Sequence, residues 1–360
     1  MTGSPVALDA HGIDGGPELA VEGARLAAAD GIGVRLFGPE SLAPACAEAD
    51  GVELEPVEEW IGNDADPVAA VRSAPGSSIV RAAAEVAEGR ASALVSAGST
   101  GATMTAALFA LKRIKGVHRP ALAAQVPLPA PDGASSALRP GAAGGAGSLL
   151  FLDVGANTEV RPQHLIQFAF LGSAFSRAVL GVERPRVALL SVGEEQKKGT
   201  PEVAEAHAAL AAQDSIVFIG NLEGRDLLTG AADVLVTDGF TGNVALKTLE
   251  GTARAVAGAV RDAARSGPLA AAGGLMLRPA LGGLRRQLDP NSVGGAVLLG
   301  LRGVAVVAHG SSTPEGIANA ARLADRAVAE RAIERTAESL RASGATREGL
   351  RDDPAPTGSR

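Results

Sequence analysis

Two segments of the sequence combine glycines and hydroxyl side chains directly before a predicted helix. Residues 96–101 read SAGSTG and lead into an apolar helix from about Thr103, and residues 238–243 read DGFTGN and lead into a helix from about Val244. A helix N-terminus presents unpaired backbone N–H groups and the positive end of the helix dipole, and glycine lets an anion approach the backbone closely. We therefore predict that both segments hold a phosphate group. The alternative is that their polar side chains are ordinary helix caps.

Acidic and basic side chains meet in residues 191–199, which read SVGEEQKKG. This segment contains two of the five lysines of the chain, whereas the other 28 of its 33 basic residues are arginines. Lysine carries a compact charge that suits a phosphate oxygen or an oxyanion that develops during a reaction. Lys198 is therefore a candidate catalytic residue, and a solvated charged loop is the alternative.

The usual signatures of nucleotide and metal binding are missing from the sequence. No Gly-x-Gly-x-x-Gly follows the first predicted strand, and residues 242–248 resemble the end of a P-loop but lack the glycine before the lysine. The five histidines are far apart, and the single cysteine, Cys46, makes neither an internal disulfide nor a multi-cysteine zinc site. The sequence therefore gives no support for a nucleotide cofactor or a metal.

The composition narrows the class of protein further. The chain has 360 residues, of which 46% are hydrophobic and 20% charged, which is enough apolar content for a folded core. Its net charge of −7 and its low aromatic content of 2% argue against nucleic-acid binding. The first residues do not resemble a secretory signal and no long apolar run is present, so we expect a cytoplasmic protein that does not span a membrane.

Short β-branched runs alternate with alanine-rich helical stretches, which is typical of a mostly parallel sheet covered by helices on both faces. Strands are predicted at residues 6–9, 34–37, 93–96, 122–126, 149–153, 187–192, 216–219, 234–237 and 304–308. Helices are predicted at residues 18–29, 67–72, 79–88, 103–112, 165–180, 201–212, 244–265 and 314–339. Many strands end in polar, glycine-rich segments, and open α/β sheets bind ligands at the carboxyl ends of their strands, so we place the site at that edge.

Two segments are predicted to lack regular structure. Residues 129–148 are rich in Ala, Gly, Pro and Ser and indicate a flexible loop, and the polar residues 346–360 indicate a disordered tail.

A partly amphipathic stretch occupies residues 254–289. It carries six arginines against two aspartates, a local charge of +4 in an acidic chain, and Leu277, Leu281, Leu284 and Leu288 recur at helical spacing. Leucines on one face with arginines nearby suit a helix that lies on an anionic membrane surface. A core-packing helix or a dimer contact is the alternative.

These motifs together resemble the bacterial phosphate acyltransferase family, whose members make acyl-phosphate from acyl-acyl-carrier protein and inorganic phosphate. The resemblance runs in order from about residue 5 to residue 330, and DGFTGNV is its most specific string. The matching segments are VALDA at 6–10 with DGGP at 14–17, SAGxTG at 96–101, LDVGAN at 152–157, LSVGEE at 190–195 with KG at 198–199, NLEGRD at 221–226, TDGFTGNVALK at 237–247, GGAxLLGL at 294–301 and HGSS at 309–312. The chain departs from the family pattern at His11, where methionine is usual, and at Ser99, where asparagine is usual.

The resemblance implies a fold and partners. The fold is a three-layer α/β/α sandwich like those of isocitrate and isopropylmalate dehydrogenases and phosphotransacetylases, here one domain over residues 1–345. Members of the family are homodimers that need no nucleotide and no metal, and they lie on the inner face of the cell membrane without spanning it. Their partners are acyl-acyl-carrier protein, inorganic phosphate and a membrane glycerol-3-phosphate acyltransferase that uses the product for phospholipid synthesis.

The resemblance also implies the site residues. Lys198 would neutralise the charge of the oxyanion or the phosphate, and Asp238 would orient Lys198 or accept a proton from phosphate. His309 is a candidate acid, with a capping role at the strand exit as the alternative. The residues expected to bind phosphate or substrate are Asp9, Ser96, Gly98, Ser99, Thr100, Gly101, Asn157, Glu194, Gly239, Thr241, Gly242 and Asn243.

Two other functions are compatible with these residues. A phosphotransacetylase would act on a short acyl-CoA instead of the carrier-protein thioester. A non-catalytic protein that binds an acyl group or phosphate would keep the fold, but it would not be expected to retain Lys198, Asp238 and Asn157 together at the strand exits.

Overall fold

The computed structural model describes residues 3–128, 147–287 and 290–350, and it describes side chains in these ranges except those of residues 278–290. Eleven strands of the described part form one sheet in the order β3-β2-β1-β4-β11-β10-β5-β6-β9-β7-β8. The strands are β1 (Val6–Asp9), β2 (Val34–Gly38), β3 (Val52–Pro56), β4 (Ala93–Ser96), β5 (Ala121–Pro127), β6 (Ser148–Leu152), β7 (Arg186–Leu190), β8 (Val217–Leu222), β9 (Val234–Val236), β10 (Ala296–Leu299) and β11 (Val304–Val307). The helices are α1 (Glu18–Ala29), α2 (Ala43–Ala47), α3 (Pro67–Ser73), α4 (Ser78–Ala87), α5 (Thr100–Leu111), α6 (Pro162–Ala178), α7 (Pro201–Ala211), α8 (Gly239–Ala264), α9 (Pro268–Gln287), α10 (Pro314–Ala329) and α11 (Ala332–Ala342).

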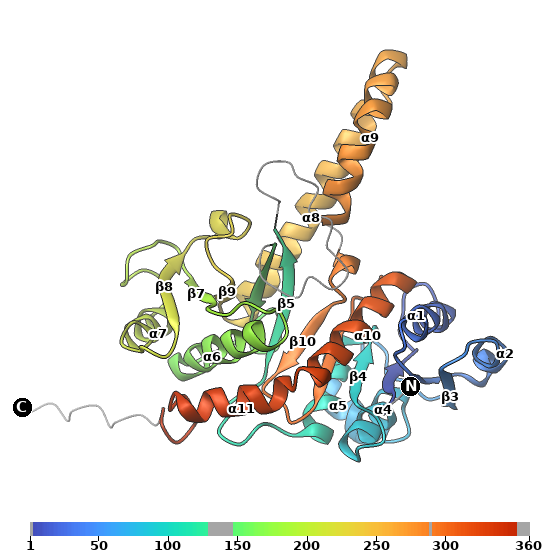
Figure 1. Cartoon of the computed structure of the whole chain (residues 1–360), viewed down its shortest axis with the longest axis horizontal. Helices are drawn as coiled ribbons and strands as arrows, with labels where there is room; N and C mark the ends of the chain where they lie inside the picture. Colours follow the sequence, from blue (N-terminus) through green and yellow to red (C-terminus); the bar gives the residue numbers. More distant parts are fainter. Residues whose placement is uncertain (1–2, 129–146, 288–289, 351–360) are drawn as a thin grey trace, which may run out of the picture.

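Helices cover both faces of the sheet, so the fold has three layers (Figure 1). One hydrophobic core packs the sheet against α1, α6, α7, α10 and α11, and the other packs it against α3, α4, α5 and the start of α8. The inner strands are short, apolar and mostly buried, because helices on both faces leave little of them in contact with water. The predicted α/β/α sandwich with a mostly parallel sheet is confirmed.

The sheet consists of two halves whose strands run in opposite directions. Strands β3, β2, β1, β4 and β11 are parallel, and so are β6, β9, β7 and β8. Strand β10 is antiparallel to both of its neighbours, β11 and β5, and β5 is antiparallel to β6. The carboxyl ends of the two halves therefore point toward each other.

The register on β5 decides where these ends meet. Ala296 of β10 pairs with Val307, at the end of β11, and with Ala124 of β5. Leu152, at the end of β6, pairs with Ala123 of β5. The two halves are thus offset along β5, and their carboxyl ends face each other across the middle of this strand.

The structure differs from the predicted elements in a few places. Strands β3 and β10 and helix α2 were not predicted, and the single helix predicted at 314–339 is two helices separated at Arg331, which has a left-handed backbone (φ 52°). The first residues of the predicted tail are structured: the Arg347 N–H donates to the Gly116 carbonyl, and Leu350 packs against the core. Most of the predicted loop 129–148 and residues 351–360 lie outside the described residues.

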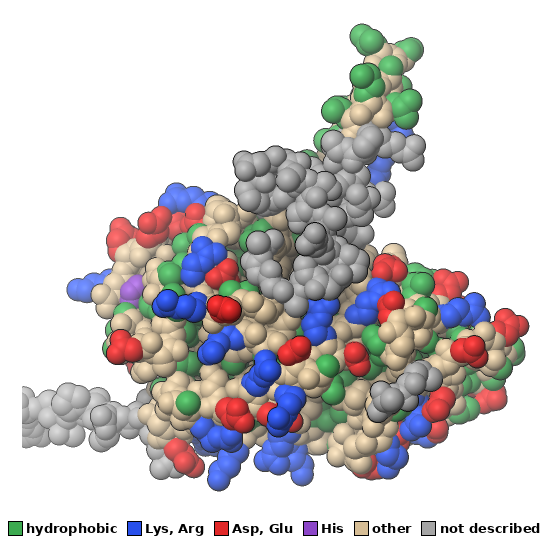
Figure 2. Space-filling view, viewed as in Figure 1, with side chains coloured by type: hydrophobic (Ala, Val, Ile, Leu, Met, Phe, Trp, Pro, Cys, Tyr) green, Lys and Arg blue, Asp and Glu red, His purple; other side chains and the backbone are tan. Residues whose placement is uncertain are grey.

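Helices α8 and α9 form a hairpin that projects far beyond the rest of the molecule (Figure 1). Hydrophobic side chains dominate the end of the hairpin in Figure 2. Leu269 and Met276 are the most exposed of them, at 88% and 84%. No helix within the described residues is long and apolar enough to cross a membrane.

Candidate active site

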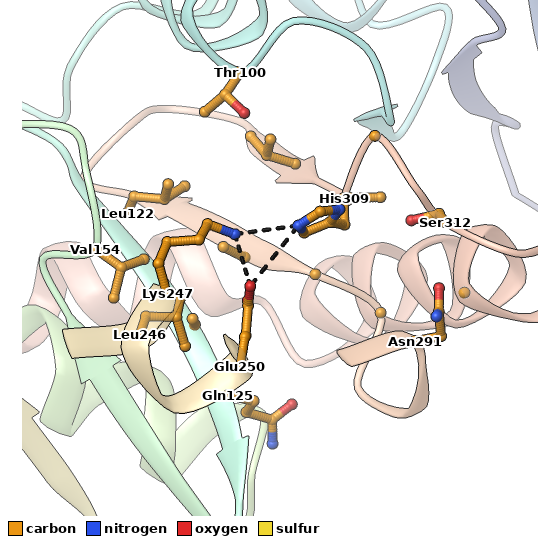
Figure 3. A pocket seen from close by; sticks show the side chains of 18 of the residues that line it. Thr100, Leu122, Gln125, Val154, Leu246, Lys247, Glu250, Asn291, His309 and Ser312 are labelled. Atoms are coloured by element: carbon orange, nitrogen blue, oxygen red, sulfur yellow. Dashed lines mark hydrogen bonds and ion pairs between the residues drawn. The ribbon is translucent and has the colours of Figure 1, made fainter. Parts of the chain in front are cut away.

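A cavity of about 360 Å³ lies where the carboxyl ends of the two half-sheets meet. The first half contributes Gly98 and Thr100 after β4 and the segment from Val307 to Ser312 after β11. The second half contributes Val154 after β6 and several residues of α8, and β5 forms the floor between them. Its apolar wall comprises Leu122, Val126, Val154, Leu228, Leu246 and Leu249, and its polar side chains include Asp14, Thr100, Asn243, Lys247, Glu250 and His309. Figure 3 shows Leu122, Val154 and Leu246 near the polar side chains of Lys247, Glu250 and His309.

A buried carboxyl group organises the loop before α5. Asp9 accepts a hydrogen bond from the Ser96 hydroxyl at 2.8 Å, and this hydroxyl accepts one from the Gly98 N–H at 3.1 Å. Burial raises the pKa of the Asp9 carboxyl. Because Asp9 and Ser96 are both buried, they act on the backbone of the loop and do not line the cavity.

A second buried carboxyl group organises the loop after β6, which contacts the first residue of α8. The Asp153 carboxylate accepts hydrogen bonds from four backbone N–H groups, those of residues 122, 155, 156 and 157, and from the Asn157 side-chain amide. Burial raises the pKa of Asp153, although these donors oppose the shift. The Asn157 carbonyl then accepts the Gly239 N–H at 2.7 Å, which fixes the first residue of α8.

The two helix N-termini differ in what their N–H groups contact. At α5, Ser99 caps the Ala102 N–H, and within the described residues the N–H groups of Thr100 and Gly101 have no hydrogen-bond partner in the protein. At α8, the Gly239 N–H is taken by Asn157, and the Thr241 N–H is taken by the Asp238 carboxylate at 2.8 Å. An anion therefore finds open donors at α5, whereas α8 already has an anion of its own, the Asp238 carboxylate, at its N-terminus.

Three side chains form a compact polar cluster on the cavity wall (Figure 3). The Lys247 Nζ lies 2.9 Å from Glu250 Oε2 and 3.1 Å from His309 Nε2. Lys247 and Glu250 are three residues apart on α8 and so share one face of this helix, while His309 follows β11 from the opposite half. Glu250 is the inner member, with its side chain 11% exposed, against 47% for Lys247 and 38% for His309.

The surroundings of His309 keep its ring neutral near pH 7. Burial lowers the pKa of His309, and the nearby Lys247 lowers it further. The other ring nitrogen, Nδ1, lies 2.8 Å from the Ser311 hydroxyl, and in the tautomer without a hydrogen on Nδ1 it accepts from the Ser311 N–H at 3.2 Å. The hydroxyl can donate to Nδ1 or accept from it, so Nε2 is free to gain or lose a proton.

Comparison with known proteins shows the family of this chain. The family model described as "Fatty acid synthesis protein" matches residues 5–335. The phosphate acyltransferase of Anaeromyxobacter sp. strain Fw109-5 is 41% identical over 352 residues, covering 96% of this chain and 93% of that protein. That of Geobacillus thermodenitrificans is 43% identical over 331 residues, covering 91% and 96%. The chain belongs to the phosphate acyltransferase family. It is therefore an acyltransferase, as predicted.

Solved structures support the fold of this acyltransferase. The EutD phosphotransacetylase from Staphylococcus aureus superimposes with a TM-score of 0.53 at 19% identity, covering 90% of this chain and 94% of that chain. A branched-chain phosphotransacylase from Enterococcus faecalis V583 gives a TM-score of 0.54 at 18% identity, covering 90% and 99%. The phosphotransacetylase-like fold is thus confirmed.

The structure brings some of the predicted site residues together and separates others. Gly98, Thr100, Asn243 and His309 line the cavity of the acyltransferase. Eight other residues that were predicted to bind phosphate or substrate do not line the cavity: Asp9, Ser96, Ser99, Gly101, Asn157, Gly239, Thr241 and Gly242.

Lys198, Glu194 and Asp238 lie elsewhere. Lys198 and Glu194 are exposed on the loop after β7, and β9 and β6 separate β7 from β5. Glu194 pairs with Arg225 at 3.6 Å on that surface. Asp238 is the N-cap of α8, and it does not line the cavity. Catalytic roles for Lys198 and Asp238 stay predictions.

Sequence reasoning missed three residues that the structure makes prominent. Asp153 stands at a polar strand exit and in the family string LDVGAN, but neither signal predicts that its carboxylate organises a whole loop. Lys247 ends the family string TDGFTGNVALK, and its P-loop resemblance gives it no role; none of the family strings includes Glu250. The Lys-x-x-Glu spacing, nine residues after Asp238 in the most specific string, was the available signal.

Proposed function

We propose that this acyltransferase transfers a fatty acyl group from acyl-acyl-carrier protein to inorganic phosphate. The product is an acyl-phosphate for phospholipid synthesis. The observation that supports the proposal best is the cavity itself, because one wall suits an anion and the other an alkyl chain. The names of the related proteins support phosphate as the acceptor.

The open N-terminus of α5 is the proposed phosphate site. The N–H groups of Thr100 and Gly101 are available there, and the helix dipole favours a negative charge. Lys247 and His309 lie on the same cavity. The acyl chain would lie against the apolar wall, where Leu122, Leu246 and Leu249 remove it from water.

The reaction then needs no external acid or base. An oxygen of the HPO₄²⁻ ion attacks the thioester carbonyl carbon, and the carbonyl electrons form an oxyanion. When this intermediate collapses, the C–S bond breaks and the sulfur leaves as a thiolate. His309 accepts the proton of the phosphate hydroxyl at Nε2 and passes it to the sulfur, so the products are acyl-phosphate and free carrier-protein thiol. A neutral ring is required for the first of these transfers, and burial keeps it neutral.

Phosphate-dependent release of carrier-protein thiol tests this function. We expect thiol release from acyl-acyl-carrier protein with phosphate, none when sulfate replaces phosphate at equal ionic strength, and formation of acyl-phosphate, which hydroxylamine traps. Equal or better kcat/KM with a short acyl-CoA would instead assign the chain to phosphotransacetylase chemistry. Failure to release thiol from either donor would leave a binding protein.

We further propose that the protein is a homodimer that works at the inner face of the cell membrane, without a nucleotide or metal cofactor. There its product would pass to a membrane glycerol-3-phosphate acyltransferase. The projecting α8–α9 hairpin supports this proposal, because Leu269, Leu275, Met276 and Leu277 are exposed on it. Exposed apolar side chains beside arginines bind anionic lipid surfaces, and the same side chains can also contact a second copy.

A further inference from the structure

We propose that Lys247 is a catalytic residue of the acyl transfer and that Glu250 is its positioning residue. The inference rests on the proposed function and adds to it the group that stabilises the reacting anion. Its basis is the position of Lys247 on the cavity wall, the depth of Glu250 beside it and the approach of His309 from the opposite half-sheet.

Lys247 is the lysine that lines the cavity. All five lysines belong to the described residues, and within them only Lys247 lines the cavity. Lys112, Lys115, Lys197 and Lys198 are exposed elsewhere. An ammonium group carries three N–H donors, of which Glu250 and His309 each engage one. The third donor is available to a ligand in the cavity.

Glu250 holds Lys247 at a cost in affinity for anions. Its carboxylate is nearly buried at 2.9 Å from Nζ, so it fixes the end of a long, flexible side chain. The same negative charge, together with that of Asp14 on the cavity wall, opposes the binding of a phosphate dianion. Because Glu250 weakens the binding of phosphate but fixes the Lys247 ammonium group, its role is best explained as the positioning of Lys247.

The cluster couples the lysine to the proton transfer. In the tautomer with its hydrogen on Nδ1, His309 gives up the hydrogen bond from the Ser311 N–H, donates to the Ser311 hydroxyl and leaves Nε2 to accept a hydrogen bond from Lys247. When Nε2 takes the phosphate proton, this hydrogen bond is lost and one Nζ–H becomes free. Lys247 can then donate to the oxyanion as the new C–O bond forms, and Lys247 itself neither gains nor loses a proton.

The test compares Lys247→Met with the matched control Lys115→Met. Methionine keeps the length of the side chain and removes its charge, and Lys115 is exposed in the loop after α5, away from the cavity. We expect Lys247→Met to lower kcat with acyl-acyl-carrier protein about 100-fold or more, as loss of one oxyanion donor does. We expect Lys115→Met to match the wild type. Phosphate binding to the protein without acyl donor, measured by calorimetry, should also weaken in Lys247→Met.

Glu250→Gln gives a readout that a purely structural role would not. Glutamine keeps an oxygen acceptor for Lys247 but removes the negative charge, so we expect the KM for phosphate to fall while kcat falls about 10-fold. A KM for phosphate that is unchanged or raised would contradict the positioning role. Unfolding curves that match the wild type should accompany each variant.

The outcomes separate the inference from the proposed function. A folded Lys247→Met variant with kcat within about 3-fold of an active wild type would overturn the inference and leave the function standing. A wild type that releases no carrier-protein thiol in response to phosphate would overturn the proposed function first. Partial recovery by Lys247→Arg would support the charge, because arginine is cationic but differs in shape.

Discussion

Replacing Gly242 with alanine should damage the active site without touching any residue that faces the ligand. Gly242 lies in the first turn of α8, where it packs directly on the Asp153 peptide. A Cβ added at this position would lie 1.8 Å from the Asp153 carbonyl oxygen and 3.0 Å from the Thr237 Cγ2. Real Cβ atoms do not approach backbone closer than 3.0 Å, so the start of α8 must retreat by about 1.2 Å.

The size of the effect follows from this retreat. Overpacking of this kind costs about 1–3 kcal/mol of folding free energy. Lys247 is five residues further along α8, about 7.5 Å along its axis, so a rigid helix carries the displacement to the cluster with Glu250. A misplacement of about 1 Å lowers turnover about 100-fold. We therefore expect a folded but poorly active enzyme.

The assay pairs thiol release with urea unfolding, and Gly258→Ala is the matched control. Gly258 is also in α8, but a Cβ there meets nothing within 4 Å. Alanine should therefore stabilise the control by up to about 1 kcal/mol through helix propensity, with turnover unchanged. If Gly242→Ala instead keeps kcat/KM within about 3-fold and its unfolding free energy within about 0.5 kcal/mol, the contact with Asp153 does not set the position of α8.

Two further predictions concern stability and the projecting hairpin. Burial is the main cause that lowers the pKa of His164 to about 4, below its ordinary value of 6.5. The unfolded chain therefore binds this proton more readily than the folded protein does. As the pH falls from 6.5 toward 4, the free energy of unfolding should decrease by about 3 kcal/mol. His164→Asn should reduce this pH dependence in urea unfolding, and an equal dependence in both proteins would refute the assignment. Replacing Leu275, Met276 and Leu277 together with Glu should abolish co-sedimentation with anionic vesicles but keep turnover on soluble acyl-acyl-carrier protein. Unchanged sedimentation would exclude this surface as the membrane contact, and a loss of dimer in analytical ultracentrifugation would assign it to the subunit interface.

The fold was predictable where apolar and polar residues follow a clear strand or helix pattern. Strands β1 and β4 and helix α1 have the predicted bounds. Strand β3 was missed because its sequence, VELEP, alternates apolar residues with glutamates, as suits a strand that pairs only with β2 at the edge of the sheet. The break between α10 and α11 was missed because Arg331 adopts a left-handed backbone without a glycine or proline to signal it.

The helix starts were predicted too late, for a reason that bears on the site. Glycines 101, 239 and 242 indicated loops, so α5 and α8 were expected to begin at Thr103 and Val244. Each of these glycines lies in the first turn of a helix. Each position requires glycine because an added Cβ would collide with Pro67, Asn157 or Asp153 respectively. Close packing, not an open phosphate cradle, explains the glycines of α8.

The reversal of strand direction within the sheet was not predicted, because no local pattern of residues specifies whether a strand runs parallel or antiparallel to its neighbours. A sheet with every strand parallel would place the loops after β7 and β4 on the same edge, and Lys198 with Thr100. In the actual order, β10 and β5 reverse the direction, so β7 and β4 run in opposite directions and the loops after them leave opposite edges of the sheet. The lysine near the reversal is Lys247, since α8 follows β9 directly.

The two half-sheets fix the start of a helix beside the cavity in the same way. Each half has a buried acid at a strand end, Asp9 as the last residue of β1 and Asp153 directly after β6. Each acid binds the backbone of a loop that leads to or supports a helix N-terminus. A buried carboxylate without a cation is costly, and burial raises the pKa of both groups. The two carboxylates offset this cost because they hold α5 and α8 at a fixed separation across β5. Because the two helices supply the Thr100 N–H and the Lys247 ammonium from opposite sides, an error in either loop would separate the two groups that the proposed reaction requires together.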